Sequence, residues 1–417
     1  MNSLCTFCKG DSHISTDKPC QDYAYSEYSE KLSMAIVSDG HGGERYFRSQ
    51  HGSEFAVKVT EEAIRCFVET MHESTFNKDN NLSIFQGKQF TSCNVDSASK
   101  KLSDSNIHEA LKLLFSSIIF KWNQAIAQHA LENELSDWEK SHVEEKYLKE
   151  FEEKRGKEES SFEKTYGCTL MAYVQTPEYW FAFHIGDGKC ITMQNKDGHL
   201  ICQQPIPWDD RCFLNKTTSL CDTDAIDEFR YCFAGDGTFP IAAFLGSDGL
   251  DDSYGDGENL INFYIQLYKI ILRNGKDKAL KELEKSLPVI SQRGSKDDMS
   301  IATIFNDEDK DNIFLLLNAY QLTKIEDAFD EIECKISMLQ EKIVGFGNEE
   351  TLERNQQINL QYAKNDLARA EEQAKRIKSK RTYLKGERTK FENRIQSDND
   401  DNTEDLSIIE TESSNEE

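Results

Sequence analysis

The chain has 417 residues and a formal net charge of -26, with 75 acidic and 49 basic side chains. A surface this acidic repels phosphate and anionic lipid, so we expect neither a nucleic-acid-binding protein nor a membrane protein. No apolar stretch approaches the ~20 residues that a membrane-spanning helix needs. The twelve cysteines are scattered singly, which is typical of reduced thiols, so we expect a cytoplasmic location.

Residues 1 to about 72 are predicted to form two strands and a helix. Residues 32 to 37 are an apolar run, and residues 47 to 71 carry apolar side chains about every four positions, which indicates an amphipathic helix. Between them lies Asp39-Gly40-His41-Gly42-Gly43. Upstream, Cys5 and Cys8 have a metal-like spacing, but a zinc site needs a second Cys or His pair, so ordinary thiols are the favoured interpretation.

The middle of the chain combines an insertion with a run of strands. We expect a polar and helical insertion at about residues 73 to 165, with its helical part beginning near residue 107. From residue 167 to 305, aromatic and β-branched runs bounded by Gly, Asp or Pro predict strands. Two helices, at about residues 258 to 272 and 276 to 287, interrupt these strands. This combination predicts an α+β layered domain.

The period changes to heptads in the C-terminal region. Apolar residues follow each other at alternating spacings of three and four from Leu322 to Ile343, and a weaker seam runs from Leu360 to Ile395. The two seams predict a helical coiled-coil hairpin at residues 320 to 396, and a dimer through the same stripe is the main alternative. Residues 397 to 417 carry nine acidic side chains and no basic one, so we expect a disordered acidic tail.

Four apolar runs each meet an aspartate at one end. The four aspartate-bearing segments are Asp39-Gly40-His41, Gly186-Asp187-Gly188, Asp248-Gly249-Leu250-Asp251-Asp252 and Gly294-Ser295-Lys296-Asp297-Asp298. If the strands are neighbours in a sheet, their ends present several carboxylates to one point. Carboxylates without His or Cys in ligand spacing suit hard ions such as Mg²⁺ or Mn²⁺. Two such ions about 4 Å apart would suit phosphate-ester hydrolysis. A single Asp-Gly is more often a hairpin turn, so the prediction depends on the whole set.

The ordered set of motifs resembles the protein phosphatase 2C family, the metal-dependent serine/threonine phosphatases. The matching segments, in chain order, are Gln21-Asp22, Val37-Ser38-Asp39-Gly40-His41-Gly42-Gly43, Tyr166-Gly167-Cys168-Thr169, Ile185-Gly186-Asp187-Gly188, Ser247-Asp248-Gly249-Leu250-Asp251-Asp252 and Ser295-Lys296-Asp297-Asp298-Met299-Ser300. The resemblance covers about residues 10 to 305. It implies a catalytic domain over residues 1 to 306, with a central β-sandwich flanked by helices in four layers, α-β-β-α.

The resemblance also implies a centre with two Mn²⁺ or Mg²⁺ ions at one end of the sandwich. Asp39 would bridge the two ions, and Gly40 would contribute its carbonyl oxygen. Asp22, Asp248 and Asp297 would complete the carboxylate shell, partly through water.

A third, weaker metal position is implied as well, at Asp187 with Asp248 and Asp252. The implied reaction is direct attack of a metal-bridging hydroxide on phosphoserine or phosphothreonine of a protein substrate in a signalling pathway. His41 matches the proposed general acid for the leaving oxygen, a task that its unperturbed pKa suits. The alternative is that His41 only orients waters.

Two departures from the family pattern concern the phosphate-binding side of the site. An arginine is common a few residues before the Asp22 position, whereas this chain offers only His13 or Lys18, and neither reproduces the bidentate guanidinium. Asp298 stands where asparagine is frequent, which adds negative charge near the metals.

Two other functions compete with the phosphoprotein phosphatase. A catalytically weak, phosphatase-like scaffold would act through its coiled coil, by binding a protein partner or by self-association. A hydrolase of small phosphate esters would use the same metal chemistry. A scaffold has no need of so many mutually repelling carboxylates, so their retention favours the enzyme.

Overall fold

The computed structural model describes most of the chain in two compact units. The described residues are 1–71, 83–86, 89–92, 98–155, 157, 161–206, 208–209, 212, 217–235, 237–255, 257–347, 349 and 352–412, with the side chains of 83–106 and 395–412 left out. Much of the polar insertion predicted at residues 73 to 105 therefore lies outside the described part. The first unit comprises residues 1–196 and 201–308, and the second comprises residues 197–200 and 309–417.

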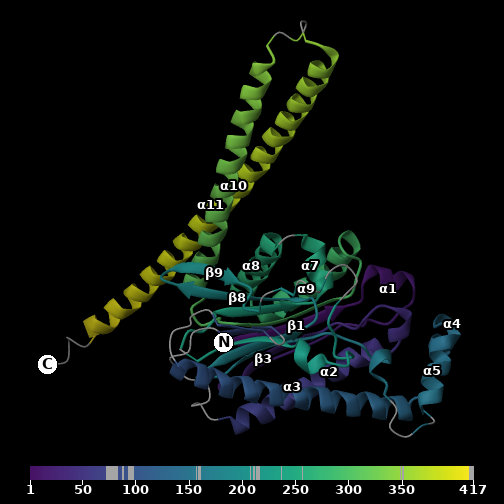
Figure 1. Cartoon of the computed structure of the whole chain (residues 1–417). Helices are drawn as coiled ribbons and strands as arrows, with labels where there is room; N and C mark the ends of the chain where they lie inside the picture. The colour runs from purple at the N-terminus through teal and green to yellow at the C-terminus, as the bar shows by residue number, and fades with distance from the viewer. Residues whose placement is uncertain are drawn as a thin grey trace. The chain divides into compact units, whose positions relative to one another are not determined.

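Two antiparallel sheets form the centre of the first unit (Figure 1). The seven-stranded sheet has the order β2 (Tyr23–Tyr28), β3 (Ser33–Ser38), β6 (Leu170–Gln175), β7 (Trp180–Ile185), β10 (Arg230–Ala234), β4 (Ser83–Gln86) and β5 (Gln89–Ser92). The five-stranded sheet has the order β1 (Asn2–Cys8), β12 (Met299–Phe305), β11 (Ala242–Gly246), β8 (Lys189–Lys196) and β9 (His199–Gln203).

Helices cover the outer faces of both sheets (Figure 1). Beside the seven-stranded sheet lie α2 (Ser49–Thr70) and α3 (Ala98–Glu132), and beside the five-stranded sheet lie α7 (Asp248–Tyr254), α8 (Gly257–Asn274) and α9 (Lys276–Arg293). The shorter helices are α1 (Asp11–Ser15), η1 (Glu44–Tyr46), α4 (Asp137–His142), α5 (Glu145–Arg155), η3 (Glu163–Thr165) and α6 (Ala225–Glu228).

The strand β3 shows why these residues form a sandwich. All six of its residues are buried, and successive side chains of a strand point to opposite faces. Met34 and Ile36 pack into the core shared with the helices α2 and α3, whereas Ala35 and Val37 pack into the core between the two sheets. On the far side, the ring of Phe244 in β11 stacks on that of Tyr264 in α8 at 4.8 Å. The predicted α-β-β-α sandwich is thereby confirmed.

Strand pairing brings the predicted motifs to one end of the sandwich. In β2 and β3, Tyr23 pairs with Ser38, which sets Asp22 beside Asp39. In β11 and β12, Gly246 pairs with Ile301, so that the segment after β11 meets the segment before β12. These two pairings join residues that are 15 and 55 positions apart in the sequence.

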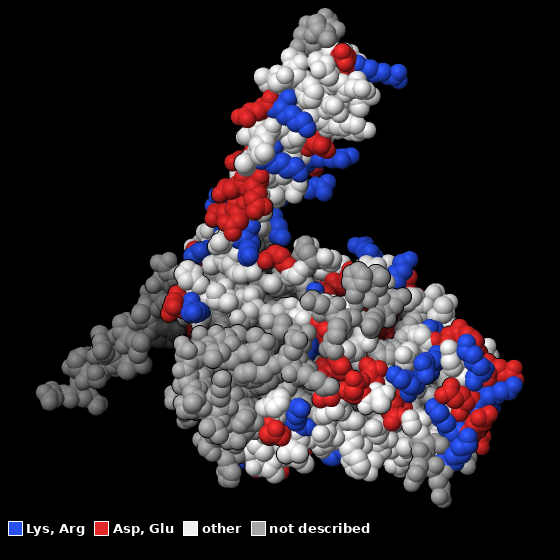
Figure 2. Space-filling model, in the orientation of Figure 1, with Lys and Arg blue, Asp and Glu red and all other residues white. Residues whose placement is uncertain are grey.

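The second unit contains a helical hairpin of α10 (Lys310–Gly345) and α11 (Arg354–Glu412). The arms are antiparallel, since Phe314 near the start of α10 stacks on Phe391 of α11 with ring centroids 4.0 Å apart. Leu322, Ile325 and Leu384 form a buried cluster between the arms. Acidic and basic side chains are interspersed along the exposed faces (Figure 2). The apolar seam is thus used within one chain, and self-association stays a prediction.

Two further features of the helices bear on the predictions. The backbone of α11 is helical through Glu412, whereas the composition of residues 397 to 417 predicts a disordered tail. A helix that is already nucleated gains one hydrogen bond for each residue it adds, which favours continuation into a polar segment. Among the described helices, none is long and apolar enough to cross a membrane.

Candidate metal centre and its surroundings

The loop after β3 is held in place by the segment that precedes β6. The backbone N–H of Asp39 donates to Thr169 Oγ1 at 3.0 Å, and the N–H of Thr169 donates to the carbonyl of Asp39 at 2.8 Å. The N–H of His41 donates to the carbonyl of Gly167 at 3.0 Å. These bonds set the direction of the Asp39 and His41 side chains.

Gly40 permits a close approach of three backbone segments. A Cβ at this position would lie 2.8 Å from the carbonyl oxygens of both Gln21 and Ser49, so only glycine fits without moving the backbone. The N–H of Gly40 donates to the Gln21 carbonyl at 3.1 Å. Through this contact the Asp39 loop and Asp22 are kept side by side.

Three aspartates from separate elements converge in the site. Carboxylate oxygens of Asp39, Asp187 and Asp248 all lie within 4.8 Å of one another. Burial and the neighbouring Asp248 raise the pKa of Asp39 well above its ordinary value. Burial and Asp187 raise the pKa of Asp248 to about 7. Concentrated, desolvated negative charge of this kind destabilises a protein unless cations balance it.

The other predicted carboxylates surround this group. Asp22 is 3% exposed, and neither of its carboxylate oxygens has a hydrogen-bond partner among the described residues. Burial and the nearby Asp298 raise its pKa well above the ordinary value. The charge of Asp297 contributes to the raised pKa of both Asp39 and Asp248. The orphaned oxygens of Asp22 fit a site for a bound cation.

Asp187 follows β7, and Asp252 lies in α7, one turn after Asp248. Burial raises the pKa of Asp187, and Asp252 adds to that shift. The pKa of Asp252 is raised by burial and by its neighbour Asp251. Asp251 itself forms an ion pair with Lys189 at 2.6 Å, which explains why it is set apart from the predicted ligands.

A buried arginine supports the Asp187 turn, and sequence reasoning missed it. The guanidinium of Arg230 donates to the carbonyl of Gly186, where the backbone has a φ of +130°. It also lies 3.1 Å from His184 Nδ1 and 3.8 Å from Asp209. Its positive charge lowers the pKa of Asp187, against the effect of burial. No local motif marks Arg230, because its partners lie 21 to 46 positions away.

Asp298 joins three segments of the fold. Its carboxylate accepts hydrogen bonds from the backbone N–H groups of Gly10 and Gln21, both at 2.6 Å. His13 Nδ1 lies 2.8 Å from the same carboxylate, and the His13 side chain is buried. The ring of His13 is therefore engaged inside the protein, which argues against the predicted role in phosphate binding.

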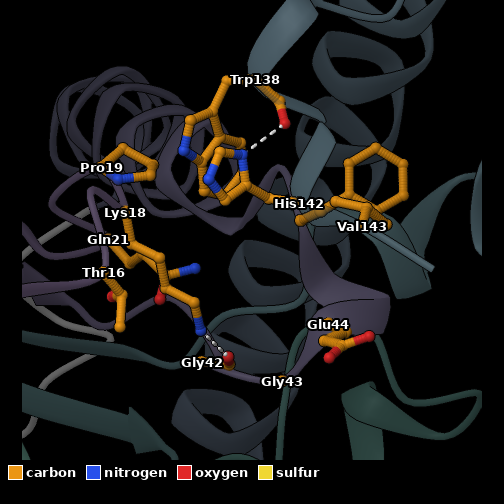
Figure 3. A pocket seen from close by; sticks show the side chains of 11 residues that line it. Thr16, Lys18, Pro19, Gln21, Gly42, Gly43, Glu44, Trp138, His142 and Val143 are labelled. Atoms are coloured by element: carbon orange, nitrogen blue, oxygen red, sulfur yellow. Dashed lines mark hydrogen bonds between the residues drawn. The ribbon is translucent and has the colours of Figure 1, made fainter. Parts of the chain in front are cut away.

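Lys18 occupies a different position, at the edge of a pocket beside residues 39–43, which we call the catalytic loop. Its Nζ donates to the carbonyl of Gly42 at 2.9 Å (Figure 3). The pocket has a volume of about 150 Å³, and Gln21, Gly42 and Gly43 are among the residues that line it. Of the two predicted phosphate-binding residues, Lys18 is the one that borders the Gly42-Gly43 backbone.

His41 is half-buried against a loop that sequence reasoning did not single out. Its Nε2 lies 2.7 Å from Ser219 Oγ, and the Ser219 hydroxyl donates to the carbonyl of Cys168 at 3.0 Å. Burial lowers the pKa of His41 to about 4, in contrast to the unperturbed pKa expected from the sequence.

A family model for protein phosphatase 2C matches residues 9–287. The chain belongs to the protein phosphatase 2C family. The resemblance inferred from the ordered motifs is thereby confirmed, and membership supports a protein phosphatase, whose substrates are phosphoproteins. A search of curated proteins gave no match.

Several solved structures are similar to this protein phosphatase 2C chain. A bacterial serine phosphatase is 13% identical, with 73% of this chain and 96% of that chain covered and a TM-score of 0.39. A C. elegans sex determining protein is 15% identical, with 76% of this chain and 67% of that chain covered and a TM-score of 0.43. The catalytic domain of the serine threonine protein phosphatase PstP, in complex with two manganese ions, is 14% identical, with 72% and 96% covered and a TM-score of 0.37.

Proposed function

We propose that this chain is a Mg²⁺- or Mn²⁺-dependent phosphatase that hydrolyses phosphoserine and phosphothreonine in proteins. The observation that carries the proposal is the convergence of Asp39, Asp187 and Asp248, whose oxygens lie within 4.8 Å of one another. Such a concentration of half-buried carboxylates needs cations to balance it. Family membership supplies the substrate class.

The chemistry of the donor groups selects the kind of ion. The available ligands are carboxylate and carbonyl oxygens, which suit hard ions such as Mg²⁺ and Mn²⁺. Asp39 and the Gly40 carbonyl would hold two ions together with Asp22, Asp248 and Asp297. When bound, the ions supply a nucleophile at neutral pH and balance the charge of the phosphoryl oxygens.

A third, weaker cation would be held on the α7 side of the cluster. The proposed ligands are Asp187, Asp248 and Asp252, because their charges act on one another. Asp252 raises the pKa of Asp187, and both of them raise the pKa of Asp248. Arg230, bonded to the Gly186 carbonyl, would keep the Asp187 turn in position whether or not this ion is bound.

His41 and Lys18 are the proposed residues that act on the substrate. With a pKa of about 4, His41 is neutral at neutral pH, which favours orientation of water over proton donation to the leaving oxygen. A His41→Asn variant distinguishes these roles, because an amide also orients water but cannot donate a proton as an acid. Lys18, at the Gly42 carbonyl, would provide one positive charge for phosphate, without the fork of an arginine.

The proposal is tested by phosphate release from a phosphothreonine peptide and from p-nitrophenyl phosphate. We expect turnover that requires Mn²⁺ or Mg²⁺, that EDTA abolishes and that Asp39→Asn lowers by at least roughly a hundredfold. Asp277→Asn is the matched control, because Asp277 is exposed in the first turn of α9. Absence of metal-dependent turnover would refute the function, and full activity of Asp39→Asn would refute the site.

A further inference from the structure

The pocket beside the catalytic loop has the composition of a binding site for an apolar side chain. Its walls include the buried Phe47 and Val143 and the half-buried Pro19 and Trp138. The Trp138 indole stacks on the imidazole of His142, with ring centroids 4.8 Å apart and planes 10° apart. This part of the pocket therefore offers a flat aromatic wall and aliphatic groups.

The residues come from segments that are remote in the sequence. Figure 3 shows Trp138, His142 and Val143 from the α4 region facing Lys18 and Pro19, with Gly42 and Gly43 of the catalytic loop at the bottom of the view. The described lining also includes two charged side chains, Glu44 and Lys18, and Lys18 is bonded to the Gly42 carbonyl. The volume of about 150 Å³ is that of a cavity known to accept a benzene-sized group.

The wall formed by α4 is held in place before any ligand binds. Glu139, next to Trp138, forms a buried ion pair with Arg48 at 2.6 Å. Ser136 caps the same helix through a reciprocal capping box with Glu139. Because Arg48 immediately precedes α2, the pocket wall and the catalytic loop are fixed to the same point of the fold. A preformed pocket binds a side chain without a cost for ordering its walls.

The pocket lies within reach of a substrate bound at the carboxylates. Gly42 is three residues after Asp39, a separation of at most about 11 Å along the chain. An extended substrate advances ~3.3 Å per residue. A peptide whose phosphoresidue is bound at Asp39 can therefore place a side chain two or three positions away in the pocket.

We propose that this pocket binds a phenylalanine- or leucine-sized side chain that lies within about three residues of the phosphoserine or phosphothreonine. The inference rests on the proposed function and adds a sequence preference to it. Recognition arises from burial of an apolar group against Trp138, Val143 and Pro19, and Lys18 lies at the rim, where its Nζ is bonded to the Gly42 carbonyl.

The test measures kcat/KM for phosphothreonine peptides in which phenylalanine replaces alanine at each position from three before to three after the phosphoresidue. We expect one position at which phenylalanine raises kcat/KM by at least roughly tenfold, mainly through KM. In Trp138→Ala this preference falls to less than about twofold, when each variant is normalised to its own turnover of p-nitrophenyl phosphate. Phe120→Ala, an exposed aromatic on α3, serves as the matched control and keeps the preference.

A second variant decides the matter if Trp138→Ala does not fold. His142 is exposed, so His142→Glu leaves the core intact and puts a carboxylate at the rim of the pocket. We expect it to lose the preference for phenylalanine and to favour lysine at the same position. The inference is overturned if no position prefers an apolar residue in the unchanged protein, or if the preference survives in both variants. Absence of turnover on every substrate contradicts the proposed function instead.

Discussion

Replacement of Glu139 by glutamine removes the charge that neutralises a buried arginine. Arg48 is 2% exposed and Glu139 is 5% exposed. The guanidinium makes two bonds to Glu139, at 2.6 and 3.2 Å. It also donates to the carbonyls of Asn133 and Glu134, at 3.1 and 2.9 Å, and to the Tyr166 hydroxyl at 3.2 Å. In Glu139→Gln the cation stays buried without its counter-charge.

The expected cost follows from the burial of the pair. Removal of one partner of a buried ion pair costs about 3–5 kcal/mol. The lower end applies here, because Arg48 keeps its bonds to two carbonyls and a hydroxyl, and glutamine still offers one oxygen. The first unit has about 300 residues, for which roughly 2.1 cal/mol/K of unfolding entropy per residue gives about 1.6 °C per kcal/mol, so the melting temperature should fall by about 5 °C. Glu152→Gln is the control: its pair with Arg155 is on the surface, and its loss should cost less than about 1 kcal/mol.

The assay is thermal unfolding followed by calorimetry at pH 7 and a fixed Mn²⁺ concentration. A double variant, Arg48→Met with Glu139→Leu, should recover most of the loss, because apolar groups replace the pair without leaving a buried charge. The reasoning fails if Glu139→Gln melts within about 1 °C of the unchanged protein. It fails equally if the double variant shows the sum of the two single effects.

Three further predictions concern the site, the pH dependence and the hairpin. Asp39→Asn should raise the melting temperature in EDTA, because it relieves the repulsion between carboxylates. It should also reduce the increase in melting temperature that Mn²⁺ causes. A lower melting temperature of this variant in EDTA would contradict the prediction. Burial lowers the pKa of His129 to about 4 from an ordinary 6.5, so the unfolded chain binds a proton that the folded chain does not between these values. The contribution of neutral His129 to the stability of the fold is therefore complete above pH 6.5 and is lost as the pH falls towards 4. His129→Gln should flatten the fall in melting temperature between pH 7.5 and 5. An unchanged fall in melting temperature would count against this prediction. Leu384→Ala should destabilise the hairpin by about 2–5 kcal/mol, seen as faster hydrogen exchange in α10 and α11, and unchanged exchange would show that the seam is not packed as described.

The layered fold was accessible from the sequence because its signals are local. The buried run before Asp39 and the Asp-Gly segments at other strand ends mark where strands stop. Their order along the chain matches a known family, which supplied the topology that periodicity alone leaves open. The heptads likewise predicted the hairpin, because the spacing of Leu322 and Ile325 is a property of one helix.

The supports of the site could not be predicted in the same way. Arg230, Ser219 and Arg48 act through partners that become neighbours only after folding, and an isolated Arg or Ser carries no spacing signal. The same limit explains His13: its residue type suits phosphate, but its contact with Asp298, 285 positions away, is a tertiary feature. The lowered pKa of His41 is also a consequence of burial, which the motif does not reveal.

The central claim is that the carboxylates around Asp39 hold metal ions. Isothermal titration with Mn²⁺ tests it most directly, in 0.5 M salt so that the many exposed acidic groups are screened. We predict saturable binding by the unchanged protein, loss of the tight sites in Asp39→Asn and their retention in Asp277→Asn. Identical titrations for the unchanged protein and Asp39→Asn would contradict the account.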